Sequence, residues 1–172
     1  MSKKTLIVLG HPNYSQSTAS KALVQLLDGA ADVTVHSISE AYPDGKIDVQ
    51  KEQALLESHD RIIFQFPTYW FNVPGFFKDW MDQVLAYGWA FGPGGTALAG
   101  KEYGVVTTTG AVAETYQPGA VGFTIDAVIL PVVASLKYCG SNYLGHAALH
   151  NAMAVTPESI AEVKDSYLKL FA

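Results

Sequence analysis

The stretch that decides the fold is Thr5-Leu6-Ile7-Val8-Leu9, which runs directly into Gly10-His11-Pro12. An uncharged and almost wholly apolar run of this length, ended by a glycine and a proline, is typical of a strand buried on both faces of a parallel sheet. Behind it, apolar side chains recur at helical spacing up to Leu27, which predicts a helix after the strand. A buried strand that leads into a helix indicates an α/β fold.

The rest of the chain repeats this alternation. Further strands are predicted over residues 32–38, 61–66, 103–109 and 141–149, and helices over residues 19–27, 49–57, 77–85, 123–136 and 157–170. Together they predict a single domain over residues 1–172, a three-layer α/β sandwich whose five-stranded parallel sheet has helices on both faces. Ligands of such folds bind beyond the carboxyl ends of the strands, here the loops after Leu9, Phe66, Thr109 and Leu149.

Composition excludes several classes of function. The 172 residues have a net charge of −5 and a single arginine, Arg61, so the basic surface of a nucleic-acid-binding protein is missing. Cys139 is the only cysteine, which excludes an intrachain disulfide and a thiolate zinc cluster. His146 and His150 have no third ligand at a fitting spacing, so no metal site is predicted. The N-terminal apolar run is too short for a signal peptide, and no segment has the length of a membrane span, which predicts a cytoplasmic protein.

The loop from Gly10 to Thr18 collects hydroxyl and amide side chains in front of a helix. Free backbone N–H groups and the helix dipole favour an anion at such a place. The chain contains no G-x-G-x-x-G fingerprint of a dinucleotide site, so the loop suits a phosphate monoester held by hydroxyls and amides. A capping turn rich in serine and threonine has the same composition and remains the alternative.

The second loop, Pro67 to Pro74, is aromatic. Residues 64–91 contain 11 of the 20 aromatic side chains, and Phe77 and Trp80 among them lie on a helical stripe and are predicted to be core. Tyr69-Trp70-Phe71 instead follow the end of a strand, where a rigid aromatic wall suits a flat conjugated ligand. An interface patch would explain the same residues.

The third loop, Thr107-Thr108-Thr109-Gly110-Ala111, has small residues that let the backbone approach a ligand closely. Glu114 and Tyr116 follow it, and as single residues they are weak signals of catalysis. His36 and His59 lie in no such constellation and are interpreted as surface histidines.

These motifs together resemble one family. They are Gly10-His11-Pro12 with Ser17-Thr18, Gln65-Phe66-Pro67-x-Tyr69-Trp70-Phe71-x-Val73-Pro74, Lys78-x-Trp80-x-Asp82-x-Val84-Leu85, and Thr108-Thr109-Gly110-Ala111 with Glu114 and Tyr116. They resemble the flavodoxin-like NAD(P)H:quinone oxidoreductases up to about residue 150. The stretch around Gly92-Pro93-Gly94-Gly95 is most similar to short bacterial members, which include general-stress quinone reductases and ancillary subunits of glutathione-gated potassium efflux systems.

The resemblance implies a flavodoxin-like fold and a homodimer with one flavin per subunit, FMN in short members and FAD in longer ones. It assigns the flavin phosphate to His11, Ser17 and Thr18. The residues that it assigns to the isoalloxazine are Pro67, Thr68, Tyr69, Trp70 and Phe71, with Thr108, Thr109, Gly110 and Ala111 on the pyrimidine side. Tyr116 is the catalytic candidate beside the reacting ring. Long members have a histidine six residues after this tyrosine, but Gly122 occupies that position here, so a Tyr-His proton relay is not carried over.

The activity that the resemblance implies is two-electron hydride transfer from NAD(P)H through the flavin to a quinone or similar electrophile, with ping-pong kinetics because both substrates use one flavin face. Two alternatives remain. A regulatory ancillary subunit would associate peripherally with a potassium efflux antiporter. A flavodoxin-type electron carrier would share fold and FMN, although the net charge of −5 lacks the usual strong acidity of that class.

Overall fold

The computed structural model describes residues 3–119 and 122–172. Five strands form one sheet in the order β2-β1-β3-β4-β5, and every neighbouring pair is parallel. The strands are β1 (Thr5–Leu9), β2 (Val33–Ser37), β3 (Arg61–Pro67), β4 (Glu102–Thr108) and β5 (Asn142–Leu149). The α-helices are α1 (Thr18–Gln25), α2 (Ile38–Ala41), α3 (Val49–Glu57), α4 (Gly75–Val84), α5 (Ile125–Tyr138) and α6 (Pro157–Lys169).

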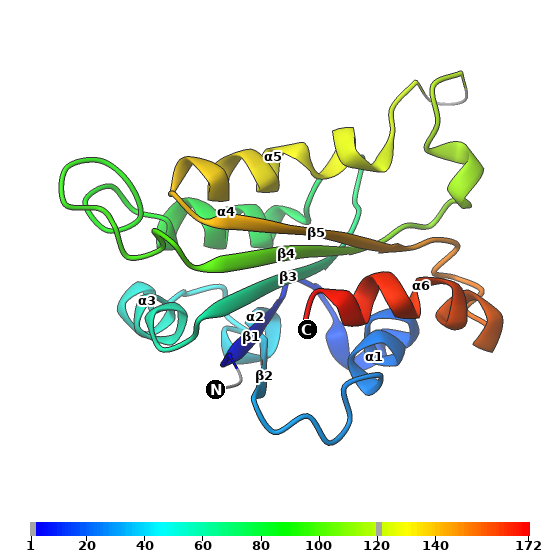
Figure 1. Ribbon diagram of the computed structural model, residues 1–172, viewed down its shortest axis with the longest axis horizontal. Coiled ribbons are helices and arrows are strands. Elements are labelled where there is room, and N and C mark those ends of the chain that lie inside the picture. The colour runs from blue at the N-terminus through cyan, green and yellow to red at the C-terminus, as the bar shows by residue number, and fades with distance from the viewer. Residues whose placement is uncertain (1–2, 120–121) are drawn as a thin grey trace.

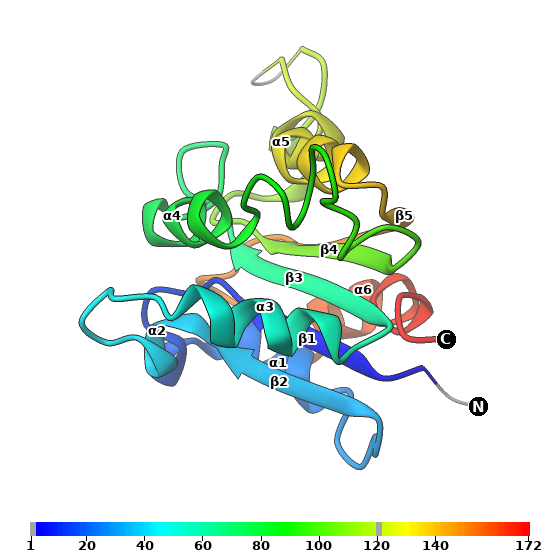
Figure 2. The ribbon, with the colours of Figure 1, turned by 90° about the vertical axis from the view of Figure 1, so that its left-hand side faces the viewer.

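The sheet lies between two layers of helices, as Figures 1 and 2 show. On one face, α1 and α6 pack on alternate residues of the central strands, such as Ile7 and Ile63. On the other face, α3, α4 and α5 cover the neighbouring residues, such as Leu6 and Phe64. The central strands therefore have both faces buried, which is why β1 is a continuous apolar run.

The predicted α/β sandwich with a five-stranded parallel sheet is confirmed, and each predicted strand and helix is present. Three short elements were not predicted from the sequence: α2 and the 3₁₀ turns Tyr14–Gln16 and Ala113–Thr115. Segments of three or four residues are too short to show a helical period of apolar side chains. The predicted core positions Phe77 and Trp80 are confirmed, because both are fully buried.

The interpretation of His36 and His59 as surface residues was wrong. His36 Nε2 lies 3.0 Å from an oxygen of Glu52, a residue of α3 that is only 1% exposed. Glu52 also accepts hydrogen bonds from the Tyr42 hydroxyl (2.7 Å) and from Trp80 Nε1 (2.8 Å). His59 is buried, and its Nδ1 lies 2.8 Å from the Leu55 carbonyl oxygen. Only the packing of α3 over the sheet reveals these partners.

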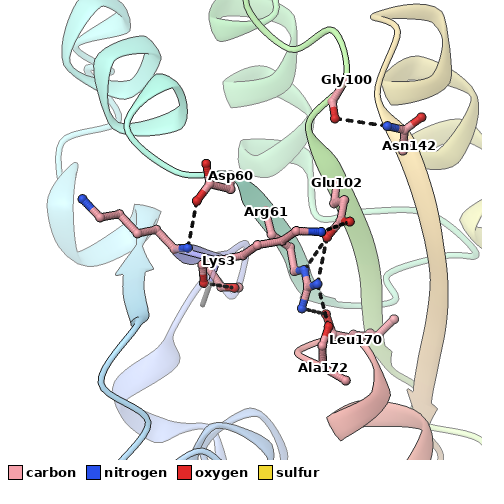
Figure 3. Close-up of polar contacts among 10 residues, drawn as sticks. Lys3, Asp60, Arg61, Gly100, Glu102, Asn142, Leu170 and Ala172 are labelled. Carbon is pink, nitrogen blue, oxygen red and sulfur yellow. Dashed lines mark hydrogen bonds and ion pairs between the residues drawn. The ribbon is translucent and has the colours of Figure 1, made fainter. Parts of the chain in front are cut away.

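Arg61 ties the end of the chain to the amino-terminal edge of the sheet (Figure 3). Arg61 is only 4% exposed, and its guanidinium donates to Glu102 Oε2 at 2.8 Å. It also donates to the backbone oxygens of Leu170 (3.0 Å) and Ala172 (2.7 Å), while Lys3 pairs with Glu102 from the solvent side. This network lies at the opposite end of the strands from the loops that carry the candidate site.

Candidate functional site

A cavity of 560 Å³ opens where the carboxyl ends of β1, β3 and β4 meet. It brings together four loops that are far apart in the sequence. Its lining includes nine of the predicted site residues: His11, Ser17, Thr18, Pro67, Thr68, Tyr69, Thr108, Thr109 and Gly110. Trp70, Phe71, Ala111 and Tyr116 do not line it. The chain leaves β1 at Gly10, where a Cβ atom would lie 2.6 Å from the Phe77 ring, so only glycine fits there.

The first wall is the turn that precedes α1. Ser17 is the N-cap of this helix, and its hydroxyl oxygen accepts from Ser20 N at 3.1 Å. Its hydroxyl proton is therefore left for another acceptor. Burial lowers the pKa of His11, and its Nδ1 accepts a hydrogen bond from the Asn13 backbone N–H at 3.1 Å. No lysine or arginine lines the cavity among the described residues, which leaves hydroxyls and backbone N–H groups as its anion-binding groups.

The second wall contains a strained aromatic turn. Tyr69 and Asn72 exchange backbone hydrogen bonds of 2.8 and 3.1 Å, and the two residues between them, Trp70 and Phe71, have φ values of 48° and 60°. Bulky residues rarely adopt this left-handed region, which costs about 1–3 kcal/mol per residue and is concentrated at functional sites. The turn holds Trp70 94% exposed. The fold therefore keeps a large aromatic surface open beside the cavity, at a cost in stability.

The loops after β4 and β5 are joined to each other past the ends of their strands, at the right-hand end of the sheet in Figure 1. Asn151 N donates to the Ala111 oxygen at 3.0 Å, and Ala152 N donates to the Thr109 oxygen at 2.9 Å. The Thr109 hydroxyl donates to the Ala111 oxygen at 2.9 Å and contacts His150 Nδ1 at 2.8 Å. Thr109 thus uses its side chain and its backbone within the protein, because its N–H also donates to the Leu149 oxygen at 3.0 Å.

Tyr116 lies beside this joined wall. Its ring is 6.4 Å from the Phe71 ring in an edge arrangement and 5.5 Å from the His150 imidazole. The structure therefore brings together the aromatic turn, the segment after β4 and the end of β5. The histidine that packs on Tyr116 comes from another strand end, not from the position of Gly122.

One wall of the cavity, residues 152–155, was not predicted from the sequence. Ala152, Met153, Ala154 and Val155 line it, together with Asn13 and Gln16 from the first loop. The loop after Leu149 had been singled out by its place at a strand end. Its small and apolar side chains have no recognisable chemistry, so position was the only signal.

Within residues 3–119 and 122–172, no group of three or more His, Cys, Asp or Glu side chains is arranged to hold a metal ion. In the same part of the chain, no helix combines the length and apolarity needed to cross a bilayer.

Comparison with known proteins identifies the family. Residues 3–171 match the family model described as the flavodoxin-like fold. An NAD(P)H oxidoreductase of Bacillus subtilis, YdeQ, is 40% identical over 167 residues, which cover 96% of this chain and 85% of the relative. The potassium-efflux ancillary protein KefG of Yersinia pestis is 34% identical over 96% of this chain and 92% of its own.

Two solved structures are similar over nearly the whole chain. General stress protein 14 of Treponema denticola, solved in complex with FMN, has 41% identity and a TM-score of 0.85, with 97% of this chain and 95% of the other covered. An NADPH-quinone reductase from P. pentosaceus has 31% identity and a TM-score of 0.88, with 98% of each chain covered. The family model and these relatives match nearly the whole chain. The chain therefore belongs to the flavodoxin-like family of NAD(P)H oxidoreductases.

Proposed function

We propose that residues 1–172 form a single-domain, FMN-dependent NAD(P)H dehydrogenase that reduces quinones or similar electrophiles. The observation that carries this proposal is the 560 Å³ cavity in which the serine-rich turn, the aromatic turn and the small-residue loop meet. The FMN complex of general stress protein 14 and the quinone reductase of P. pentosaceus support the choice of cofactor and acceptor.

The residues present fit FMN. A phosphate monoester suits the N-terminus of α1, where the Ser17 hydroxyl and the first backbone N–H groups of the helix are available without a formal cation. The small residues Thr108 and Gly110 leave room at the opposite side, and a Cβ at Gly110 would meet no atom within 4 Å. Tyr69 contributes an aromatic face between these two ends.

When bound, the flavin would supply the hydride and electron chemistry, and the protein would bind, orient and tune it. The backbone N–H groups of Gly110 and Ala111 would stabilise negative charge near the ring, because their loop is held rigidly by its bonds to residues 149–152. We propose that the Tyr116 hydroxyl assists in this. Trp70, which is exposed beside the cavity, would stack on the substrate's flat rings.

Two alternative roles are separated by experiment. A flavodoxin-type electron carrier would bind FMN but be reduced by NADPH negligibly. A role as ancillary subunit of a potassium efflux system, suggested by the similarity to KefG, is compatible with enzyme activity. Co-purification with an antiporter from membranes would support it.

We expect the purified protein to be yellow, with one FMN per chain released on denaturation. The double variant Ser17→Ala, Thr18→Ala removes hydroxyl partners of the phosphate, each charge-assisted bond being worth about 1.5–3 kcal/mol, so FMN affinity should fall about tenfold or more. Ser159→Ala, at the start of α6, is the matched control and should bind FMN like the wild type. A colourless protein that neither FMN nor FAD reconstitutes would contradict the proposed function.

Tyr116→Phe tests the role of the hydroxyl. The ring contacts with Phe71 and His150 are retained, so FMN binding should be unchanged. We expect reduction by NADPH to slow by about ten- to a hundredfold, which corresponds to about 1.4–2.7 kcal/mol of barrier. Stopped-flow absorbance measures this rate, with Tyr87→Phe, an exposed tyrosine beyond α4, as control. Equal rates for wild type and Tyr116→Phe would assign Tyr116 to packing alone.

We propose a two-fold dimer that uses the outer face of α5. This helix leaves Leu130 and Tyr138 exposed, although both are large and apolar. Light scattering should give twice the chain mass of 18.5 kDa at micromolar concentration. Leu130→Glu should shift the protein to monomers, whereas Val35→Glu on the edge strand β2 should leave the dimer intact. A monomeric wild type would overturn this assignment.

A further inference from the structure

His150 lies in the wall between two cavities. Its Nδ1 atom is 2.8 Å from the hydroxyl of Thr109, which lines the 560 Å³ cavity of the candidate site. His150 itself lines a second cavity of 430 Å³ between β5, α6 and the segment after β4. The polar residues of this second cavity are Glu114, His150, Asn151, Ser159, Glu162 and Ser166. The imidazole therefore separates the candidate flavin site from a polar space behind it.

The hydrogen bonds determine which nitrogen of His150 carries the proton. The Thr109 hydroxyl has a single proton and donates it to the Ala111 oxygen at 2.9 Å, so toward His150 it can only accept. His150 Nδ1 is consequently the donor, in both the neutral and the charged imidazole. Nε2 is then the atom that gains or loses a proton, and this exchange leaves the bond to Thr109 in place.

The groups that face His150 make a reversible charge there feasible. Glu114 and Tyr116 approach from the segment after β4, and Glu162 approaches from α6. Burial lowers the pKa of His150, and the charge of Glu114 partly opposes this. His146, the other histidine of β5, contacts Tyr143 and Asp126 instead and lines neither cavity. Burial therefore disfavours the protonated form of His150, and the nearby charge of Glu114 favours it.

We propose that His150 is a titrating charge in the wall of the flavin site, which links the reduction potential of bound FMN to pH. This inference rests on the proposed function. A hydride from NAD(P)H brings two electrons and one proton nucleus, so it adds one negative charge to the cofactor. Uptake of one proton from water by Nε2 balances that charge. When the acceptor is reduced by the same hydride, the proton on Nε2 is released to the acceptor or to water.

Linkage fixes the sign of the effect. Because negative charge on the cofactor favours the protonated imidazole, the pKa of His150 must be higher in the reduced than in the oxidised protein. By the same coupling, protonated His150 favours reduction, so the potential rises more steeply as pH falls between these two pKa values. Protonation of His150 should therefore change the ratio of the dissociation constants of oxidised and reduced FMN by on the order of tenfold.

The experiment measures the midpoint potential of the FMN-loaded protein between pH 5 and pH 8, for wild type, His150→Asn and His146→Asn. Asparagine keeps a donor near the Nδ1 position, and thus the bond to Thr109, but cannot titrate. We expect the curves of wild type and His146→Asn to show the same break and that of His150→Asn to lack it, while oxidised FMN binds all three equally. Imidazole NMR signals of the wild type should also show an upward pKa shift of His150 on reduction.

Parallel potential curves for wild type and His150→Asn would overturn the inference and leave the proposed function standing. Should His150→Asn fail to fold, the wild-type NMR titration decides, because an unchanged pKa of His150 on reduction overturns the inference without any variant. A protein that binds no flavin overturns the proposed function, and the inference falls with it.

Discussion

Replacing Glu52 with glutamine should lower the free energy of unfolding at pH 7 by about 3 kcal/mol, because it breaks a buried network of charge-assisted hydrogen bonds. The carboxylate accepts from three donors: His36 (3.0 Å), Tyr42 (2.7 Å) and Trp80 (2.8 Å). A glutamine side chain has one acceptor oxygen, and its NH₂ group would face a donor. Glu57→Gln is the matched control, since Glu57 also accepts from a tryptophan, Trp89, but at an exposed position of the same helix.

The effect of Glu52 should depend on pH. Burial by itself raises the pKa of Glu52, but the hydrogen bonds from His36, Tyr42 and Trp80 outweigh it and hold the pKa below its ordinary value of 4.5. A depressed pKa stabilises the folded state above the unfolded pKa, and this stabilisation is lost as pH falls through the folded pKa. Urea unfolding from pH 7 to pH 3 should therefore show the stability difference between wild type and Glu52→Gln shrinking at acid pH. A constant difference would mean that the carboxylate is not the ionised acceptor.

Arg61→Met should destabilise the fold by about 3 kcal/mol, because the buried guanidinium anchors both a carboxylate and the end of α6. The loss removes the bonds to Glu102, Leu170 and Ala172 at 2.7–3.0 Å. Lys3→Met removes the other partner of Glu102. Because Lys3 is solvent-exposed, this change should lower the free energy of unfolding by less than about 1 kcal/mol.

The Arg61 and Lys3 variants are compared by urea midpoints at equal denaturation slopes. FMN affinity should be unchanged in both, since this network lies at the amino-terminal ends of the strands and the cavity at the carboxyl ends. Equal midpoints for the two variants would show that burial of Arg61 adds nothing to the pair. A loss of FMN affinity would show that the two ends of the sheet are coupled.

Several features could be predicted because they depend on short-range patterns. The run from Thr5 to Leu9 predicted a doubly buried strand, and the stripe through Phe77 and Trp80 predicted a core helix, because periodicity reports directly which side chains are buried. Ligands of parallel α/β folds bind beyond the carboxyl ends of the strands, and this rule predicted the loops that line the cavity. The same patterns could not assign residues 152–155, whose side chains have no chemistry of their own.

The sequence by itself determined the order of strands and helices, the apolar faces that stack into three layers, and the loops at the ends of the strands. These follow from local propensity and from burial, which every segment expresses in its own residues. Only the tertiary structure decided that Glu52 is a buried carboxylate with three donors, that Arg61 holds the end of α6, and that His150 packs on Tyr116. Each of these depends on contacts between residues 10 to 111 positions apart, which no local pattern records.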